Sequence, residues 1–448
     1  MGTLDELTPW LFSRVSGGVS LGLERTEQLL AGAGNPHRLF RSILIGGTNG
    51  KGSVSALCEA ALWKAGRRTG LYTSPHLVSF TERIRIDGVP IREEVLAEIA
   101  ERLRPAIEET GASFFEATTA MAFIAFAEAG VEIAVVEVGL GGRLDSTNVL
   151  TPLVTAVTNV AVDHTEFLGD TVERIALEKA GIFKPGVPVV TAERETAPLK
   201  VLRERAAEVG APFHTLDAPA GASAGDPERA PVEPGKMLST PDGLTLGLLS
   251  SVWGERLLQV PLRGPYQARN VAQAVAVLGL LPEAFRPEWK AVEAGFRSVR
   301  WPGRLQVEHR EGVVWVFDVA HNPAGSRVLV EALSSLKLPS PVVGVVGILS
   351  DKDWRLMLPI LAGQFDHLIL TTPDTAPPGR RWDLDAVSAT WLSELAQTAS
   401  RTPEVELHAD LSDALRRAGE IAEGGSVVVT GSVHTVGDTL AHLGISPV

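Results

Sequence analysis

The densest cluster of chemically useful residues is a glycine-rich segment near the N-terminus. Residues 46–53 read GGTNGKGS and join a short apolar run to a helical pattern. Glycines let successive backbone N–H groups turn toward a phosphate, and the start of a helix adds a favourable dipole. Lys51 would supply a cation, and Ser53 could reach a magnesium ion. The segment therefore predicts a phosphate-binding loop rather than a plain strand–helix turn with an exposed lysine.

This loop departs from the commonest nucleotide-binding pattern, G-x-x-x-x-G-K-[ST], at two positions. Ile45 takes the place of the first glycine, and Gly52 follows the lysine where Ser or Thr is usual. The loop is therefore not typical of a generic nucleotide hydrolase.

Two polar residues follow apolar runs that read as buried strands. Glu137 lies near the end of the run 133–138, and His164 follows the run 154–160. Parallel α/β sheets form their ligand sites at the C-terminal ends of strands. A carboxylate there suits Mg²⁺, which combines a few protein ligands with waters and phosphate oxygens. By residue type alone, Glu137 could equally be a turn or capping acid, and His164 a structural histidine.

Other reactive residues also have simpler interpretations. Lys179 lies in a helical pattern over 172–182, where a solvated lysine or a salt bridge with Glu178 would be ordinary. The aromatic pair Phe114 and Phe115 is typical of a hydrophobic core.

The elements that would position these residues alternate strand-like runs with helical patterns. This alternation predicts a parallel sheet covered on both faces by helices. Residues 215–243 are rich in Pro, Gly, Ala and Ser, which predicts an exposed excursion or small hairpins outside the core. We place a domain boundary near residues 298–301, giving domains 1–299 and 300–448. The expected strands are 42–45, 133–138, 154–160, 187–190, 313–317, 342–346, 367–370 and 426–429, with a helix over 51–65.

Composition limits the class of protein. The chain has 448 residues, 45% hydrophobic and 21% charged, with a formal net charge of −13, which excludes disorder and argues against nucleic-acid or anionic-membrane binding. Its single cysteine, Cys58, excludes a disulfide framework and a Cys-rich zinc site, and is interpreted as core packing.

The acidic N-terminus and the lack of a long apolar run predict a cytoplasmic protein. His434, which has no recognisable partner, is interpreted as structural.

The string GTNGKGS resembles the ATP loop of the Mur ligase superfamily, and most closely that of folylpolyglutamate synthases and dihydrofolate synthases. Further strings of that family follow along the chain in the same order. They are SPHL at 74–77, ERI at 82–84, FFEATT at 114–119, EVGLGGRLDSTN at 137–148, DH at 163–164, LG at 168–169 and EKAGI at 178–182.

The last third of the chain matches the family more loosely. Three family positions carry a different residue: Tyr266 replaces His in H-Q-x-x-N, Gln306 replaces Glu after W-x-G-R-L, and Val319 replaces Gly in D-G-A-H-N-P. A D-K-D string occurs at 351–353. These departures all lie in motifs expected to form the second-domain side of the site.

The resemblance implies an N-terminal P-loop ATPase-like domain with a mostly parallel sheet and a smaller Rossmann-like C-terminal α/β domain. It also implies roles for individual residues. Lys51, Lys179 and His321 would be catalytic, and Lys179 would be carbamylated. ATP would contact Thr48, Asn49, Gly50, Lys51, Gly52, Ser53, Asn270, Arg304 and Asp318. Two Mg²⁺ ions would involve Ser53, Ser74, Glu137 and His164. The pterin or folate would contact Val19, Ser20, Leu21, Ser113, Phe114, Phe115, Glu116, Leu144, Asp145 and Ser146.

The activity implied is an ATP-dependent amide ligase. It would add L-glutamate to dihydropteroate and further γ-linked glutamates to reduced folates through an acyl phosphate, and would work as a monomer. Three alternatives remain: a folylpolyglutamate synthase with that activity alone, a Mur-type ligase of cell-wall precursors, and a non-catalytic ATP-dependent switch.

Overall fold

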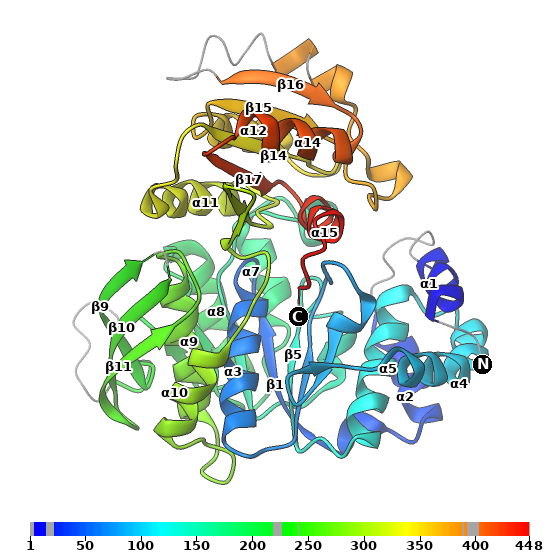
Figure 1. Cartoon of the computed structure of the whole chain (residues 1–448). Coiled ribbons are helices and arrows are strands. Elements are labelled where there is room, and N and C mark those ends of the chain that lie inside the picture. The colour runs from blue at the N-terminus through cyan, green and yellow to red at the C-terminus, as the bar shows by residue number, and fades with distance from the viewer. Residues whose placement is uncertain are drawn as a thin grey trace.

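The computed structural model describes residues 4–14, 22–217, 226–240, 242–387, 389–391 and 403–447. Three sheets organise them, and Figure 1 shows the larger N-terminal part below a smaller C-terminal part. The predicted α/β fold class, with a mostly parallel first sheet and a second α/β part, is confirmed.

The first sheet has eight strands in the order β4-β3-β2-β5-β1-β6-β7-β8. Six of them run parallel, and β3 and β4 form an antiparallel edge. The strands are β1 (Arg41–Gly46), β2 (Thr69–Tyr72), β3 (Ile84–Ile86), β4 (Val89–Pro90), β5 (Ile133–Glu137), β6 (Val154–Val157), β7 (Val189–Thr191) and β8 (Phe213–Thr215).

Helices cover both faces of this sheet because its central strands are apolar on both sides. Leu44 and Val136 pack into one core, whereas their neighbours Ile43 and Val135 pack into the other. The first core is covered by α1 (Leu4–Ser13), α2 (Glu24–Gly32), α4 (Glu93–Thr110), α5 (Phe114–Glu128), α7 (Val172–Ala180) and α8 (Thr196–Val209). The second is covered by α3 (Lys51–Lys64), α9 (Gln267–Leu280) and α10 (Trp289–Ser298).

A three-stranded antiparallel sheet packs against α9. Its strands are β9 (Val232–Thr240), β10 (Gly243–Ser250) and β11 (Gly254–Val260). The segment 215–243 contributes β9, the first strand of a hairpin whose second strand is β10. The expectation that the segment lies outside the core is wrong for Ala230 and Val232, which are buried in the same core as α3, whereas residues 235–238 are exposed. Alternate apolar residues of the hairpin face a helix, which composition alone does not reveal.

The C-terminal part contains a six-stranded sheet in the order β12-β13-β17-β14-β15-β16, parallel except for β12. Its strands are β12 (Gln306–Arg310), β13 (Val313–Phe317), β14 (Val342–Val346), β15 (His367–Thr371), β16 (Glu404–His408) and β17 (Ser426–Thr430). One face is covered by α11 (Pro323–Leu336) and α12 (Trp354–Ala362), and the other by α14 (Leu411–Ile421) and α15 (Val433–His442).

All eight expected strands are present; β13 and β14 have the expected bounds, and the other six have shifted ends. The run 154–160 leaves the sheet after Val157 because Thr158 turns to the phosphate loop, where its hydroxyl donates to the Asn49 carbonyl at 2.7 Å. The helix expected over 172–182 ends at Ala180. Within the described ranges, no helix is long and apolar enough to cross a membrane.

Cys58 lies in α3 and is fully buried in the second core, as its interpretation as core packing requires. Burial raises the pKa of its thiol.

Candidate active site

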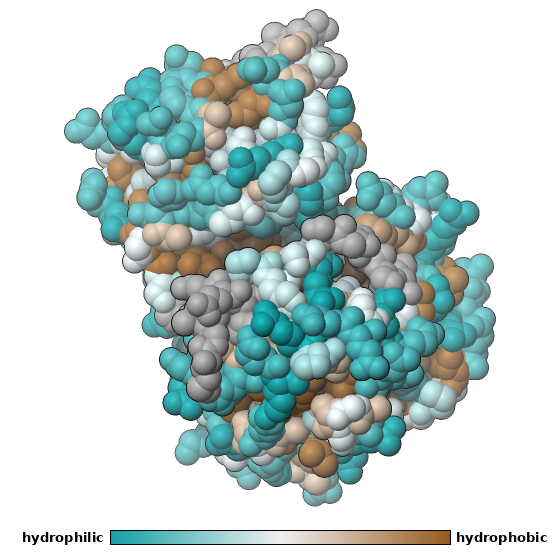
Figure 2. Space-filling model, turned by 90° about the vertical axis from the view of Figure 1, so that its right-hand side faces the viewer, coloured by the Kyte–Doolittle hydropathy of each residue, from teal (hydrophilic) through white to brown (hydrophobic). Residues whose placement is uncertain are grey.

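A cavity of about 2000 Å³ lies between the two parts of the molecule. Figure 2 shows that the molecule is narrower between its upper and lower parts. Every described residue that the sequence singled out for ATP, metal, folate or catalysis lines this one cavity. Val19, Ser20 and Leu21 lie outside the described residues.

The phosphate loop, residues 46–53, joins β1 to α3 as predicted. Gly47 has φ 131°, and a Cβ there would lie 1.9 Å from the Thr158 hydroxyl oxygen, so only glycine fits. Helix α3 begins at Lys51 without a side-chain cap, which leaves its first N–H groups free for an anion. The Lys51 ammonium donates to the Thr48 carbonyl at 3.0 Å and lies 3.9 Å from a Glu137 oxygen.

Glu137 ends β5 and is buried beside this loop. Its second oxygen accepts from the backbone N–H of Ser74 at 3.2 Å. Burial raises the pKa of the carboxyl, and the Lys51 charge only partly offsets that effect. Because Lys51 neutralises the buried Glu137 carboxylate only in part, this carboxylate is suited to binding a second cation.

His164 lines the same cavity and lies in a left-handed turn, with φ 52°. Although its side chain is 40% exposed, partial desolvation in the cavity and the Lys352 ammonium lower its pKa to about 4, so the imidazole is neutral, the form that binds a metal. The described residues contain no group of three or more His, Cys, Asp or Glu side chains able to hold an ion. Glu137 and His164 both line the cavity, and Mg²⁺ commonly combines a few protein ligands with waters and phosphate oxygens.

Lys179 lies on the buried side of α7, not on the helix surface and not in a salt bridge with Glu178. Its ammonium donates to the Gly47 carbonyl at 2.9 Å, and the residue is 4% exposed. Burial and the Lys51 charge lower its pKa to about 7. A large neutral fraction at physiological pH is what reaction with CO₂ requires.

The aromatic wall of the cavity is built at the start of α5. Phe114 stacks on Phe12 with ring centroids 4.9 Å apart and meets Phe80 edge-on at 5.9 Å. Phe115 is only partly buried, and it lies against Gly139, where a Cβ would come within 2.3 Å of the ring. Both phenylalanines face the cavity as well as the core.

Two of the residues expected to contact folate, Glu116 and Asp145, also bind neighbouring parts of the chain. The Glu116 carboxylate accepts from the Ser113 N–H at 2.7 Å and pairs with Arg25 at 3.0 Å. The Asp145 carboxylate accepts from the backbone N–H of Leu140 at 2.8 Å and from Thr147. Leu144 and Ser146, in the same turn as Asp145, also line the cavity.

The C-terminal part supplies the other side of the cavity. The Asp318 carboxylate follows β13 and accepts from the N–H groups of Leu305 at 2.9 Å and Ala320 at 3.0 Å. Arg304, near Asp318, counters the burial that raises the pKa of that carboxyl. The side chain of Asn270, on α9, lies against Gly50 of the phosphate loop, where a Cβ would come within 2.6 Å of its Oδ1.

The three departures from the family pattern are accommodated locally. The Tyr266 hydroxyl lies 3.5 Å from Asp318, and Gln306 accepts from the Gly303 N–H at 3.0 Å. Val319 is buried beside Gly303.

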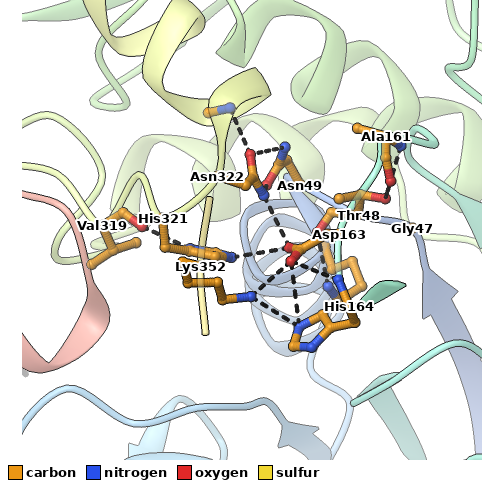
Figure 3. A network of polar contacts seen from close by, with 12 residues as sticks. Gly47, Thr48, Asn49, Ala161, Asp163, His164, Val319, His321, Asn322 and Lys352 are labelled. Carbon is orange, nitrogen blue, oxygen red and sulfur yellow. Dashed lines mark hydrogen bonds and ion pairs between the residues drawn. The ribbon is translucent and has the colours of Figure 1, made fainter. Parts of the chain in front are cut away.

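Sequence reasoning missed a polar network that joins the two parts (Figure 3). Asp163 accepts from Lys352 and Asn322 and lies 3.6 Å from His321. Burial alone would raise the pKa of Asp163, but the His321 hydrogen bond and the Lys352 charge lower it well below its usual range. The strings DH and DKD contain Asp163 and Lys352, but nothing in the sequence indicates that these two residues form a pair.

His434, which had no partner in the sequence, has one in the structure. Its Nδ1 lies 2.8 Å from the Thr375 hydroxyl, and both residues line the cavity. Another unassigned residue of the cavity is Arg83, whose Nε donates to Nδ1 of His76 at 2.8 Å. The interpretation of His434 as structural stays untested.

Comparison with known proteins agrees with this geometry. The family model "Mur ligase middle domain" matches residues 45–278, and "Mur ligase, glutamate ligase domain" matches residues 303–433. A probable dihydrofolate synthetase of Schizosaccharomyces pombe is 33% identical over 438 residues, which cover 95% of this chain and 99% of that protein.

Solved structures are similar over almost the whole chain. Mycobacterium tuberculosis folylpolyglutamate synthase complexed with ADP has a TM-score of 0.87 at 32% identity, covering 99% of both chains. The bifunctional folylpolyglutamate synthase/dihydrofolate synthase of Yersinia pestis, complexed with AMPPNP and Mn ion, has a TM-score of 0.81 at 31% identity, again covering 99% of both chains. The chain therefore belongs to the folylpolyglutamate synthase and dihydrofolate synthase family of the Mur ligase superfamily.

Proposed function

We propose that this protein is an ATP-dependent ligase that adds L-glutamate to dihydropteroate and further γ-linked glutamates to reduced folates. One observation carries the proposal: the phosphate loop, the buried Glu137, Lys179 and the aromatic wall all line a single cavity. ATP and an aromatic carboxylic acid would then meet in one place.

The reaction must make a carboxylate reactive toward an amine. Transfer of the γ-phosphoryl group of ATP to the carboxylate gives an acyl phosphate, and attack by the amine of glutamate then releases phosphate. Phosphoryl transfer depends mainly on positioning and charge neutralisation. The N–H groups at the start of α3 would hold the phosphates, and Lys51 would neutralise their charge.

The buried Glu137 and the neutral His164 support a divalent ion beside this loop. Ser53, Ser74, Glu137 and His164 would hold Mg²⁺, which polarises the phosphoryl oxygens when it is bound. The two Mg²⁺ ions and the carbamylated Lys179 implied by the family are part of the proposal, supported by the depressed pKa of that lysine.

The remaining contacts are divided between the two sides of the cavity. Asn270, Arg304 and Asp318 would contact ATP, with His321 near the reacting groups. The aromatic wall of Phe114 and Phe115 would pack against the pterin. Ser113, Glu116, Leu144, Asp145 and Ser146, which line the same cavity, would contact the folate. The Glu116 and Asp145 carboxylates would also hold the surrounding chain in place through their bonds to backbone N–H groups.

The division into domains 1–299 and 300–448 is part of the same proposal. It is supported by the segment between the end of α10 at Ser298 and the start of β12 at Gln306, which joins the first core to the second α/β sheet. We also propose that the protein is a cytoplasmic monomer. Light scattering of the purified protein tests the monomer, and cell fractionation tests the compartment.

The decisive experiment measures phosphate release and folate products side by side. Purified protein receives ATP, Mg²⁺ and glutamate with either dihydropteroate or tetrahydrofolate. We expect dihydrofolate from the first and a γ-glutamylated product from the second, and Lys51→Ala should abolish both. Turnover that persists in Lys51→Ala would refute the assignment of the phosphate loop.

The same assay separates the alternatives. Product from tetrahydrofolate alone would indicate a folylpolyglutamate synthase with one activity. Turnover only with UDP-linked peptides would indicate a cell-wall ligase, and ATP hydrolysis indifferent to acid and amine would indicate a switch.

A further inference from the structure

The two parts of the molecule are tied together at one buried carboxylate. Asp163 follows β6, and its side chain is 8% exposed. One oxygen accepts from the Lys352 ammonium at 2.7 Å, and the other accepts from the Asn322 amide at 3.1 Å and lies 3.6 Å from His321 Nε2. Figure 3 shows these three side chains converging on Asp163 from the C-terminal part.

The same contacts reach the phosphate loop. The side-chain amides of Asn322 and Asn49 face each other, with nitrogen–oxygen distances of 3.2 Å and 3.5 Å. The Asn322 oxygen also caps α11 by accepting from the Gly325 N–H at 2.7 Å. The start of α11 is therefore held against the loop that would carry the phosphates of ATP.

Burial makes the pair of Asp163 and Lys352 sensitive to separation. The Lys352 side chain is 9% exposed, so neither charge is well solvated while they are together. Removing one member of a buried pair leaves the other uncompensated, which is strongly unfavourable. The pair therefore favours one relative position of the two parts, with His321 pointing into the cavity.

We propose that Asp163 and Lys352 are positioning residues, forming an interdomain latch that keeps the cavity closed while the activated carboxylate waits for the glutamate amine. This inference rests on the proposed function. In a loosened cavity, water instead of the amine attacks the acyl phosphate. The bond between acyl group and phosphate breaks, the carboxylate and phosphate are released, and one ATP is consumed without an amide product.

The test is the ratio of phosphate released to amide formed. Wild-type protein and Lys200→Met should give a ratio near one, because Lys200 lies on the surface of α8 in an exposed pair with Glu204. Lys352→Met and Asp163→Asn should each lower kcat by about tenfold or more and raise the ratio several-fold. The double variant should be no worse than either single one, and Lys352→Arg should restore coupling.

Several outcomes would overturn the latch. Additive losses in the double variant would show that the two residues act separately. A raised KM for glutamate in Lys352→Met, with normal kcat and ratio, would make Lys352 a substrate contact. Loss of Mn²⁺ binding in Asp163→Asn but not in Lys352→Met, measured by electron paramagnetic resonance, would make Asp163 a metal ligand.

The latch can fail independently of the proposed function. If the wild-type protein forms no folate amide, the proposed function has failed, and small-angle X-ray scattering still tests the latch. Lys352→Met should then have a larger radius of gyration than wild type and Lys200→Met. Equal radii would refute the latch.

Discussion

The buried Lys179 makes the sharpest prediction about chemistry at the site. Its nitrogen is 2.9 Å from the Gly47 carbonyl, and burial lowers its pKa to about 7 from the usual lysine value of 10.5. CO₂ reacts only with the neutral amine. We therefore expect Lys179 to form a carbamate far more readily than the other lysines of this protein.

The expected size of the effect follows from the two pKa values. At pH 8, a lysine with a pKa of about 7 is about nine-tenths neutral, whereas one at 10.5 is about 0.3% neutral, a difference of about 300-fold. Between pH 6 and pH 8, the neutral fraction of Lys179 rises about tenfold, from about one-tenth to about nine-tenths.

The assay is carbon-13 NMR of the protein with labelled CO₂ at a fixed dissolved concentration and no added divalent metal. The initial rate of carbamate formation should rise about tenfold from pH 6 to pH 8. Lys179→Met should lose the signal. Lys184→Met is the matched control and should keep it, since Lys184 donates to the Asn148 carbonyl in the neighbouring loop.

A second readout needs no CO₂. Because Lys179 binds its proton less tightly in the folded than in the unfolded chain, unfolding free energy should rise with pH between about 7 and 10.5. From pH 6 to pH 8, wild type should gain about 1.4 kcal/mol relative to Lys179→Met in urea denaturation. Two results together would refute the depressed pKa of Lys179. They are a carbamate signal that persists in Lys179→Met and a difference in unfolding free energy between wild type and Lys179→Met that does not change with pH.

Three substitutions test the packing around the site. Gly47→Ala would push a methyl group against Thr158 and would place an alanine at the φ of 131° that Gly47 adopts. The substitution should cost about 2–4 kcal/mol of stability and abolish nucleotide binding in calorimetric titration. Tight nucleotide binding by the variant would contradict this. The Glu82 carboxylate accepts from three backbone N–H groups of the loop 77–79, which lines the cavity next to Phe80 and the aromatic wall. Glu82→Gln should therefore raise the KM for folate more than that for ATP, and equal changes would argue against this role of the loop. Arg25→Met leaves the buried Glu116 unpaired and should cost about 1–3 kcal/mol in chemical denaturation, unlike Arg25→Lys.

The sequence was most informative where the pattern is local. The phosphate loop, its flanking strand and its helix depend on neighbouring residues, and all three are found where they were predicted. The pairing of Asp163 with Lys352 joins residues 189 positions apart, so no spacing rule could indicate it. It depends on how the two parts pack, which is a property of the whole fold.

Glu116 shows a different limit. Its place in the first turn of a helix beside two phenylalanines fits both a folate contact and a structural role. The string S-x-x-E at 113–116 was a visible sign of a capping box, and the structure contains one, with Ser113 and Glu116 each bonded to the other's backbone N–H. Its partner Arg25, 91 positions away, was beyond the reach of any local pattern.

The burial of Cys58 has a practical consequence for studying how the cavity opens. The chain has one cysteine, and it is fully buried with a raised thiol pKa, so reagents that need a thiolate should leave the folded protein unlabelled. New cysteines at exposed positions such as Val89 and Leu356, one in each part, could then carry a pair of spectroscopic labels while the native thiol stays in place. Distances across the cavity would thus be measurable during turnover without disturbing the core.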